Sequence, residues 1–255
     1  MEADFFEKVE TVEVRTSGGP LQLPILYRDA FLAAGVFSAP TARVRELLPS
    51  LDLVPLEKWR GRTLVGFAAF SYRDTTIGPY NELGIVVPVK FRPASRSRIV
   101  PALRMASTLS FDLFVWKLPV TAEAALTAGV EVWGYPKSMA EITFEERPGQ
   151  VVCRLAQEGE QVLALSVRRR NPSLKTYLEF NTYSVKEGRL LWTPVRGLST
   201  GMARSFMPGA ARLDLGGHPL AEQLRDLELS NRATLALYAP RLQAVLPAAE
   251  QAYPL

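Results

Sequence analysis

The feature that most limits the fold of this chain is its succession of short apolar runs separated by turn residues. The runs span roughly five to ten residues, are rich in β-branched and aromatic side chains, and recur along most of the sequence. Such a pattern predicts a mainly β protein (α+β), built as an antiparallel barrel or sandwich. The expected strands are 11–15, 63–72, 83–91, 108–116, 141–146, 151–157, 161–168, 175–185, 189–193 and 233–238.

Segments with helical spacing are few and short. They are expected at 40–48, at 122–128 with Thr121 as N-cap, at 219–227 and at 240–246. None is long enough to cover a parallel sheet, which argues against a doubly wound nucleotide-binding fold. The sequence has no linker, internal repeat or low-complexity stretch, so a single domain over residues 1–255 is expected.

The chain contains one cysteine, Cys153, and one histidine, His218. Zinc and most transition-metal sites need three or four thiolate or imidazole ligands, so we expect no metal site of that kind and no metal among the site residues. A disulfide within the chain is impossible with one cysteine. We expect Cys153 to be a core residue and His218 to be a turn residue that begins a helix. No cofactor is expected.

The charge and hydropathy of the sequence limit the kinds of partner that the protein is expected to bind. Lys and Arg number 30 and Asp and Glu number 26, a net charge of +4, and the one basic run is Arg168–Arg170. This balance lacks the basic face with interleaved aromatics typical of nucleic-acid binding. The acidic start of the sequence lacks the pattern of a secretory signal, and no run of about 18 apolar residues occurs. The expectation is a cytoplasmic protein with no membrane or nucleic-acid partner.

Two segments place a charged residue in an apolar setting. Glu82 lies in the turn 78–84 before an apolar strand, and Lys137 lies among Trp, Tyr, Pro and Met in 131–139. An amine attacks a carbonyl only when it is neutral, and apolar burial or a neighbouring cation favours the neutral form. The alternatives without a functional role are a solvated turn for Glu82 and, for Lys137, a buried stem with its charged end in water.

The segment 131–137, with the sequence EVWGYPK, resembles the imine-forming segment of the acetoacetate decarboxylase family, and 78–82, GPYNE, resembles its acidic active-site segment. Weaker similarity covers 40–49 and 215–220, so the resemblance extends over most of the chain. It implies a cone-like antiparallel β-barrel with a few short peripheral helices, often assembled into large homo-oligomers. It also implies a small-molecule keto acid as substrate.

The resemblance further implies roles for five residues. Lys137 corresponds to the lysine that forms the imine, and Glu82 to the carboxylate for proton transfer. Tyr135 corresponds to a wall of the pocket and Glu131 to a supporting carboxylate. Arg28 is the nearest match, after a shift of about two residues, to an arginine that faces the substrate carboxylate.

Two positions depart from the family pattern, and we assign both to the substrate pocket. Ser138 stands where the acetoacetate-active enzymes carry a second lysine, and Phe67 stands where they carry a further carboxylate. Both departures make the pocket more apolar and favour a different or larger keto acid over acetoacetate. An ionised Glu82 close to Lys137 favours the charged amine, so either Glu82 is partly neutral or it acts through substrate or water.

Three functions therefore stand. The first is decarboxylation of acetoacetate or a related 3-oxo acid through an imine on Lys137, giving a ketone and CO₂. The second keeps the imine but joins pyruvate to an aldehyde and dehydrates the product. The third is a barrel that binds an apolar small molecule and catalyses nothing.

Overall fold

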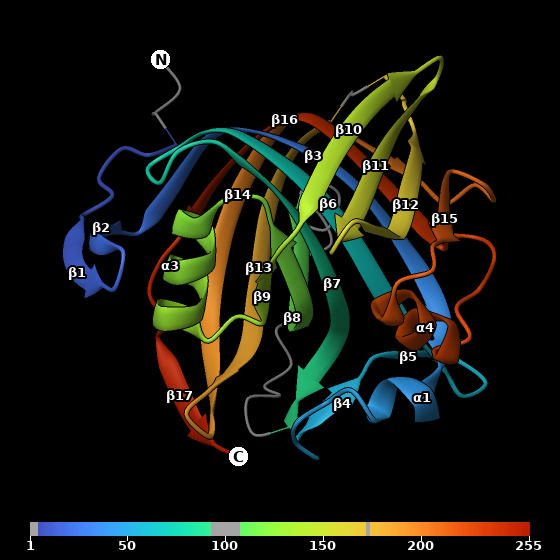
Figure 1. Ribbon diagram of the computed structural model, residues 1–255, viewed down its shortest axis with the longest axis horizontal. Coiled ribbons are helices and arrows are strands. Elements are labelled where there is room, and N and C mark those ends of the chain that lie inside the picture. The colour runs from blue at the N-terminus through green and yellow to red at the C-terminus, as the bar shows by residue number, and fades with distance from the viewer. Residues whose placement is uncertain (1–4, 93–107, 172–173) are drawn as a thin grey trace.

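Seven strands close into a β-barrel in the computed structural model, which describes residues 5–92, 108–171 and 174–255 (Figure 1). Their order is β7-β6-β3-β16-β14-β13-β8, and β8 pairs back onto β7. All neighbours are antiparallel except β8 and β13, which run parallel. The barrel strands are β3 (Ile25–Pro40), β6 (Arg62–Thr75), β7 (Tyr80–Phe91), β8 (Thr108–Val120), β13 (Leu174–Lys186), β14 (Arg189–Ser205) and β16 (Leu235–Leu246).

A second sheet of four strands packs against the outside of the barrel over β3 and β6 (Figure 1). Its strands are β10 (Glu141–Arg147), β11 (Gln150–Gln157), β12 (Glu160–Arg168) and β15 (Ala211–Leu215). The interface between sheet and barrel is a core of fully buried side chains that includes Phe37, Phe67, Cys153 and Leu165. We call it the outer core. The prediction that Cys153 is a core residue is confirmed.

The smaller elements surround this frame. Helix α3 (Glu123–Trp133) lies across one mouth of the barrel, beside the hairpin β1–β2 (Figure 1). The others are β1 (Val12–Thr16), β2 (Gly19–Leu23), α1 (Thr41–Arg45), β4 (Leu53–Pro55), β5 (Glu57–Trp59), β9 (Lys137–Met139), α4 (Pro219–Asp226) and β17 (Gln251–Pro254). Among the residues described, no helix is both long and apolar enough to span a membrane.

The helix expected at 240–246 is wrong, because these residues form the second half of strand β16. Leu242, Ala244 and Leu246 alternate toward the barrel interior at the strand period of two. The ladder with β3 shifts register between Ala239 and Leu242, so Pro240 lies in an irregularity where no ladder N–H is needed. The leucine spacing fits a helix as well as a strand, and pairing with β3 and β14 decides between them.

The three other expected helices exist, with different ends. The one at 40–48 shrinks to α1, and the one at 122–128 extends to Trp133 as α3. Thr121 is not the N-cap of α3, because its hydroxyl accepts a hydrogen bond from the backbone N–H of Asn81 and Ala122 takes the cap position. His218 caps α4 as expected, with Nδ1 accepting from the N–H of Leu220.

Strand β3 is the longest element that the sequence analysis missed. Residues 30–35 are apolar at almost every position, and the structure buries both faces of this stretch, one against the barrel interior and one in the outer core. Burial on both faces removes the alternation by which a strand is usually recognised.

Candidate active site

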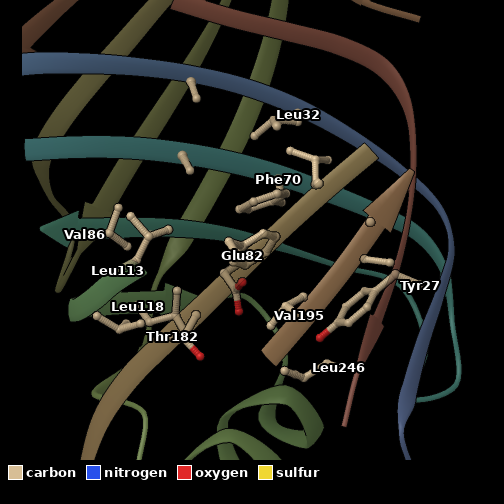
Figure 2. Close-up of a pocket in the computed structure, with 18 of the residues that line it drawn as sticks. Tyr27, Leu32, Phe70, Glu82, Val86, Leu113, Leu118, Thr182, Val195 and Leu246 are labelled. Carbon is tan, nitrogen blue, oxygen red and sulfur yellow. The ribbon is translucent and has the colours of Figure 1, made fainter. Parts of the chain in front are cut away.

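The barrel encloses a cavity of about 190 Å³ whose lining is almost entirely apolar. Its polar side chains gather near the end that α3 covers: Tyr27, Tyr72, Glu82, Tyr135, Lys137 and Thr182. Figure 2 shows the Glu82 carboxylate directed into this space, with Val86 and Leu113 to one side of it and Tyr27 and Leu246 to the other. The cavity is therefore an apolar chamber with one group of polar residues.

The end of helix α3 places Lys137 at this group. Gly134 adopts a left-handed conformation (φ 62°), and its N–H bonds back to the carbonyls of Gly129 and Val130, which ends the helix. A Cβ at Gly134 would lie 2.5 Å from the carbonyl oxygen of Val185, so only glycine fits there. After Pro136 the chain turns into β9, which pairs in parallel with β8 and sets Lys137 beside Leu118.

The stem of Lys137 passes directly over Gly129 in the middle of α3. A Cβ built on Gly129 would come within 2.3 Å of Cε and 2.4 Å of Cδ of the lysine. The missing side chain of Gly129 thus forms the groove in which the lysine lies. A glycine in a helix interior costs about 1 kcal/mol relative to alanine, and here it makes room for the lysine.

Glu82 faces Lys137 from barrel strand β7, which pairs with the other edge of β8. Lys137 Nζ lies 2.6 Å from Glu82 Oε2, and the two side chains are only 5% and 8% exposed. Glu82 Oε1 accepts a second hydrogen bond, of 3.1 Å, from the hydroxyl of Tyr72. The arrangement in which Glu82 stands away from the lysine and acts through substrate or water is not the one found, because at 2.6 Å neither fits between the two groups.

Three tyrosines surround the pair. Tyr27 and Tyr80 share a hydrogen bond of 3.1 Å between their hydroxyls, and the Tyr72 ring lies 4.4 Å and 4.7 Å from theirs, centroid to centroid. Lys137 Nζ lies 5.6 Å from the centroid of Tyr80, a cation–π distance. Burial is the largest cause that raises the pKa of all three phenols well above the ordinary value, and the charge of Glu82 adds to it. They remain protonated hydrogen-bond donors.

Tyr135 lines the cavity, where the sequence analysis placed it. Its hydroxyl lies 2.7 Å from Thr182 Oγ1, and burial raises the pKa of this phenol. Its ring stacks on Trp133, with 5.9 Å between centroids.

Among the residues described, no three His, Cys, Asp or Glu side chains are grouped to hold a metal ion.

Arg28 and Phe67 are not brought to the cavity. Arg28 is 45% exposed on the outside of β3 and pairs with Asp74 at 3.4 Å. Phe67 is fully buried in the outer core, edge-to-face with Phe37 at 5.7 Å. Their neighbours Tyr27 and Ala68 line the cavity instead, because successive side chains of a strand point to opposite faces.

Glu131 and Ser138 also lie away from the cavity. Glu131 accepts hydrogen bonds from the backbone N–H and the hydroxyl of Ser17, which lower its pKa and tie α3 to the β1–β2 turn. Ser138 Oγ accepts a 2.9 Å hydrogen bond from Gln157 Nε2 of the second sheet. Neither contacts Lys137 through these bonds.

The sequence analysis missed Gly129 and the tyrosines Tyr27, Tyr72 and Tyr80. Gly129 directly follows the helix expected at 122–128, where a glycine usually ends a helix, so its position inside α3 became apparent only in the structure. Tyr80 lies in the segment 78–82 that carries the family resemblance, whereas Tyr27 and Tyr72 carry no signal, since the three come from different strands and meet only when the barrel closes.

Fold and site together define a class of protein: closed β-barrels with a buried lysine–carboxylate pair facing an apolar interior. The family model described as acetoacetate decarboxylase (ADC) matches residues 15–245. The chain belongs to the acetoacetate decarboxylase family.

Solved structures agree on the fold. An acetoacetate decarboxylase structure is 18% identical, with a TM-score of 0.62 and coverage of 90% of this chain and 89% of that one. The acetoacetate decarboxylase from Legionella pneumophila is 16% identical, with a TM-score of 0.65 and coverage of 98% and 91%. The enduracididine biosynthesis enzyme MppR, complexed with pyruvate, is 14% identical, with a TM-score of 0.58 and coverage of 88% of each chain. No curated protein matches the chain.

Proposed function

We propose that this protein is a cofactor-independent carbon–carbon lyase that decarboxylates acetoacetate or a related 3-oxo acid through an imine on Lys137. The observation that carries the proposal is the contact of 2.6 Å between Lys137 and Glu82, nearly fully buried at the wall of an apolar cavity. Membership of the acetoacetate decarboxylase family supports it.

The first step needs a neutral amine, and the contact supplies a route to it. Glu82 Oε2 accepts a proton from the Lys137 ammonium across their hydrogen bond, leaving a neutral amine and a neutral acid. The apolar lining favours this exchange, because buried charges are poorly solvated unless they are well paired. Tyr72 holds the other oxygen of Glu82, so the carboxyl group keeps its orientation toward the lysine.

The amine then attacks the ketone carbon of the substrate. The resulting carbinolamine loses water, with Glu82 donating the proton to the leaving hydroxyl, and a protonated imine forms. The bond between the α-carbon and the carboxylate breaks, and its electron pair moves into the imine to give an enamine and CO₂. A proton returns to the α-carbon, and water releases the ketone and regenerates the lysine.

Borohydride trapping tests the proposal. Reduction in the presence of acetoacetate and a panel of keto acids, followed by peptide mass analysis, is expected to fix a substrate-derived adduct on Lys137. Lys117 is a matched control, since its Nζ lies 5.4 Å from the Trp116 ring but outside the cavity lining. Lys137→Ala is expected to lose adduct and turnover, and Lys117→Ala to keep both. Absence of an adduct on Lys137 with every keto acid would contradict the proposal.

A second activity has one observation in its favour. MppR has been seen with pyruvate and with the condensation product of pyruvate and imidazole 4-carboxaldehyde, and this chain shares its fold. The same imine on Lys137 can therefore serve an aldol condensation and dehydration of pyruvate with an aldehyde. Product analysis with both compounds separates the two activities, because only the second joins two carbon skeletons.

A cavity that binds without catalysis is the remaining alternative. It predicts that Lys137→Ala retains ligand affinity and that neither protein turns over any keto acid.

The cytoplasmic location and the homo-oligomeric state remain predictions from sequence and family resemblance.

A further inference from the structure

Small side chains widen the cavity on one side of Glu82. This side lies toward Gly84 on strand β7, away from Tyr80. Ala34 pairs with Ala68, and Ala68 pairs with Gly84, so three adjacent strands present a row of minimal side chains to the interior. On the opposite wall Gly197 pairs with Ala244, and both line the same space. A barrel of about this size is normally filled by its own side chains, so these residues leave room for a ligand.

The open space runs along β7 away from the reacting pair. Gly84 and Val86 follow Glu82 on the same face of this strand, and both line the cavity. At about 3.3 Å per residue, Val86 lies roughly 13 Å along the strand from Glu82. A cavity of about 190 Å³ exceeds more than tenfold the ~10–15 Å³ that a single water needs. A space for more than ten waters can hold a ligand larger than acetoacetate, which has seven non-hydrogen atoms.

Away from the polar side chains near α3, the lining of this space is apolar. In the lining that the structure describes, Lys137 is the one cation, and Glu82 already pairs with it. The walls beyond the pair are aliphatic or aromatic and include Leu32, Phe70 and Leu113. A charged or hydroxylated group placed there would lose its water without gaining a partner.

We infer that the substrate is a 3-oxo acid whose ketone carries an apolar tail of several carbons, which lies along Ala34, Ala68 and Gly84. The inference rests on the proposed function and names its substrate class. The bond between the α-carbon and the carboxylate carbon breaks, its electron pair passes into the imine on Lys137, and a proton replaces the carboxylate. Hydrolysis of the imine then releases a methyl ketone bearing the tail, together with CO₂.

A chain-length series tests the inference. Turnover of acetoacetate, 3-oxohexanoate and 3-oxooctanoate is followed by CO₂ release and by quantifying the methyl ketone. We expect kcat/KM to rise about fourfold for each added methylene, roughly 200-fold from the first acid to the last, as the tail leaves water. Flat or falling values, with acetoacetate still turned over, would overturn the tail and leave the proposed function standing.

Filling the space tests its location. Ala68→Leu is expected to remove most of the gain with 3-oxooctanoate, about 50-fold or more, because its added carbons occupy the path of the tail. The far-UV circular dichroism spectrum of the same variant shows whether the barrel has folded, and the ratio of kcat/KM for 3-oxooctanoate to that for acetoacetate measures the change in preference. Ala34→Leu offers the same test from β3. An unchanged preference for the long acid in both folded variants would contradict the assigned path, whereas no turnover or adduct at any chain length, in the parent protein, would defeat the proposed function itself.

Discussion

Strands β3 and β6 each contribute to two apolar regions that differ in how they are filled. On their outer faces Phe37 and Phe67 pack edge-to-face in the outer core, which is closed by the second sheet. On their inner faces Ala34 and Ala68 stand side by side at the cavity. The same strands thus serve two purposes: close packing on one face stabilises the fold, and small side chains on the other leave a binding space.

The largest test of this contrast compares two phenylalanines on strand β6. Phe67→Ala is expected to lower the free energy of unfolding by about 3–5 kcal/mol, because it removes apolar contacts and leaves a new hole in a packed core. Phe70→Ala is expected to cost only about 1.5–3 kcal/mol, the transfer of one side chain, since Phe70 already borders a cavity. Urea unfolding of both variants measures the difference. Equal losses would show that the inner face stabilises the barrel as much as the outer one.

The groove under Lys137 gives the next test. Gly129→Ala puts a Cβ where the lysine stem lies, so the flexible lysine moves while the helix stays. Alanine favours a helix by about 1 kcal/mol, but moving the lysine weakens its buried contact with Glu82, so the free energy of unfolding is expected to fall. Displacing the amine by about 1 Å is expected to reduce kcat about 100-fold.

Gly18→Ala is the control for this change. A Cβ at Gly18 would meet Thr127 at an ordinary 3.6 Å, away from the lysine, so kcat should be unchanged. A Gly129→Ala protein that keeps full kcat would show that Lys137 does not need its present path.

At high pH the two regions are expected to lose stability over different pH ranges, because their titratable groups differ. Burial raises the pKa of Cys153, in the outer core, from 9.0 to about 12. Above pH 9 the unfolded chain releases this proton and the folded protein keeps it, so the free energy of unfolding falls as pH rises toward 12. The loss is about 1.4 kcal/mol for each pH unit. The buried tyrosines around Glu82 add a second loss above pH 10, where unfolded tyrosines begin to ionise.

Urea unfolding between pH 8 and pH 11 follows the loss, with tyrosinate absorbance as a second signal. Cys153→Ala should flatten the slope between pH 9 and 10 and leave the fall above pH 10. Tyrosinate from the buried phenols appearing before unfolding would contradict the protonated cluster around Glu82.

The same alternation of faces explains where the sequence analysis succeeded and failed. The family resemblance brought Lys137 and Glu82 together across 55 residues, and the structure places them in contact. Arg28 and Phe67 were each one position away from a residue that lines the cavity, Tyr27 and Ala68. With a period of two, an error of one residue moves a side chain to the opposite face, and no composition or spacing signal corrects it.

The smallest effect on stability and on kcat/KM is expected from substitution of Ser138. This residue follows Lys137 on β9, but its hydroxyl accepts a hydrogen bond from Gln157 of the second sheet and it is not part of the cavity lining. Ser138→Ala is expected to cost about 0.5–1.5 kcal/mol of stability. It should change kcat/KM by less than about twofold, because Lys137 keeps its path over Gly129 and its contact with Glu82. A tenfold change, measured with the substrate that traps on Lys137, would mean that the second sheet positions the lysine through β9, so that the outer face of the barrel acts on the chemistry of the inner one.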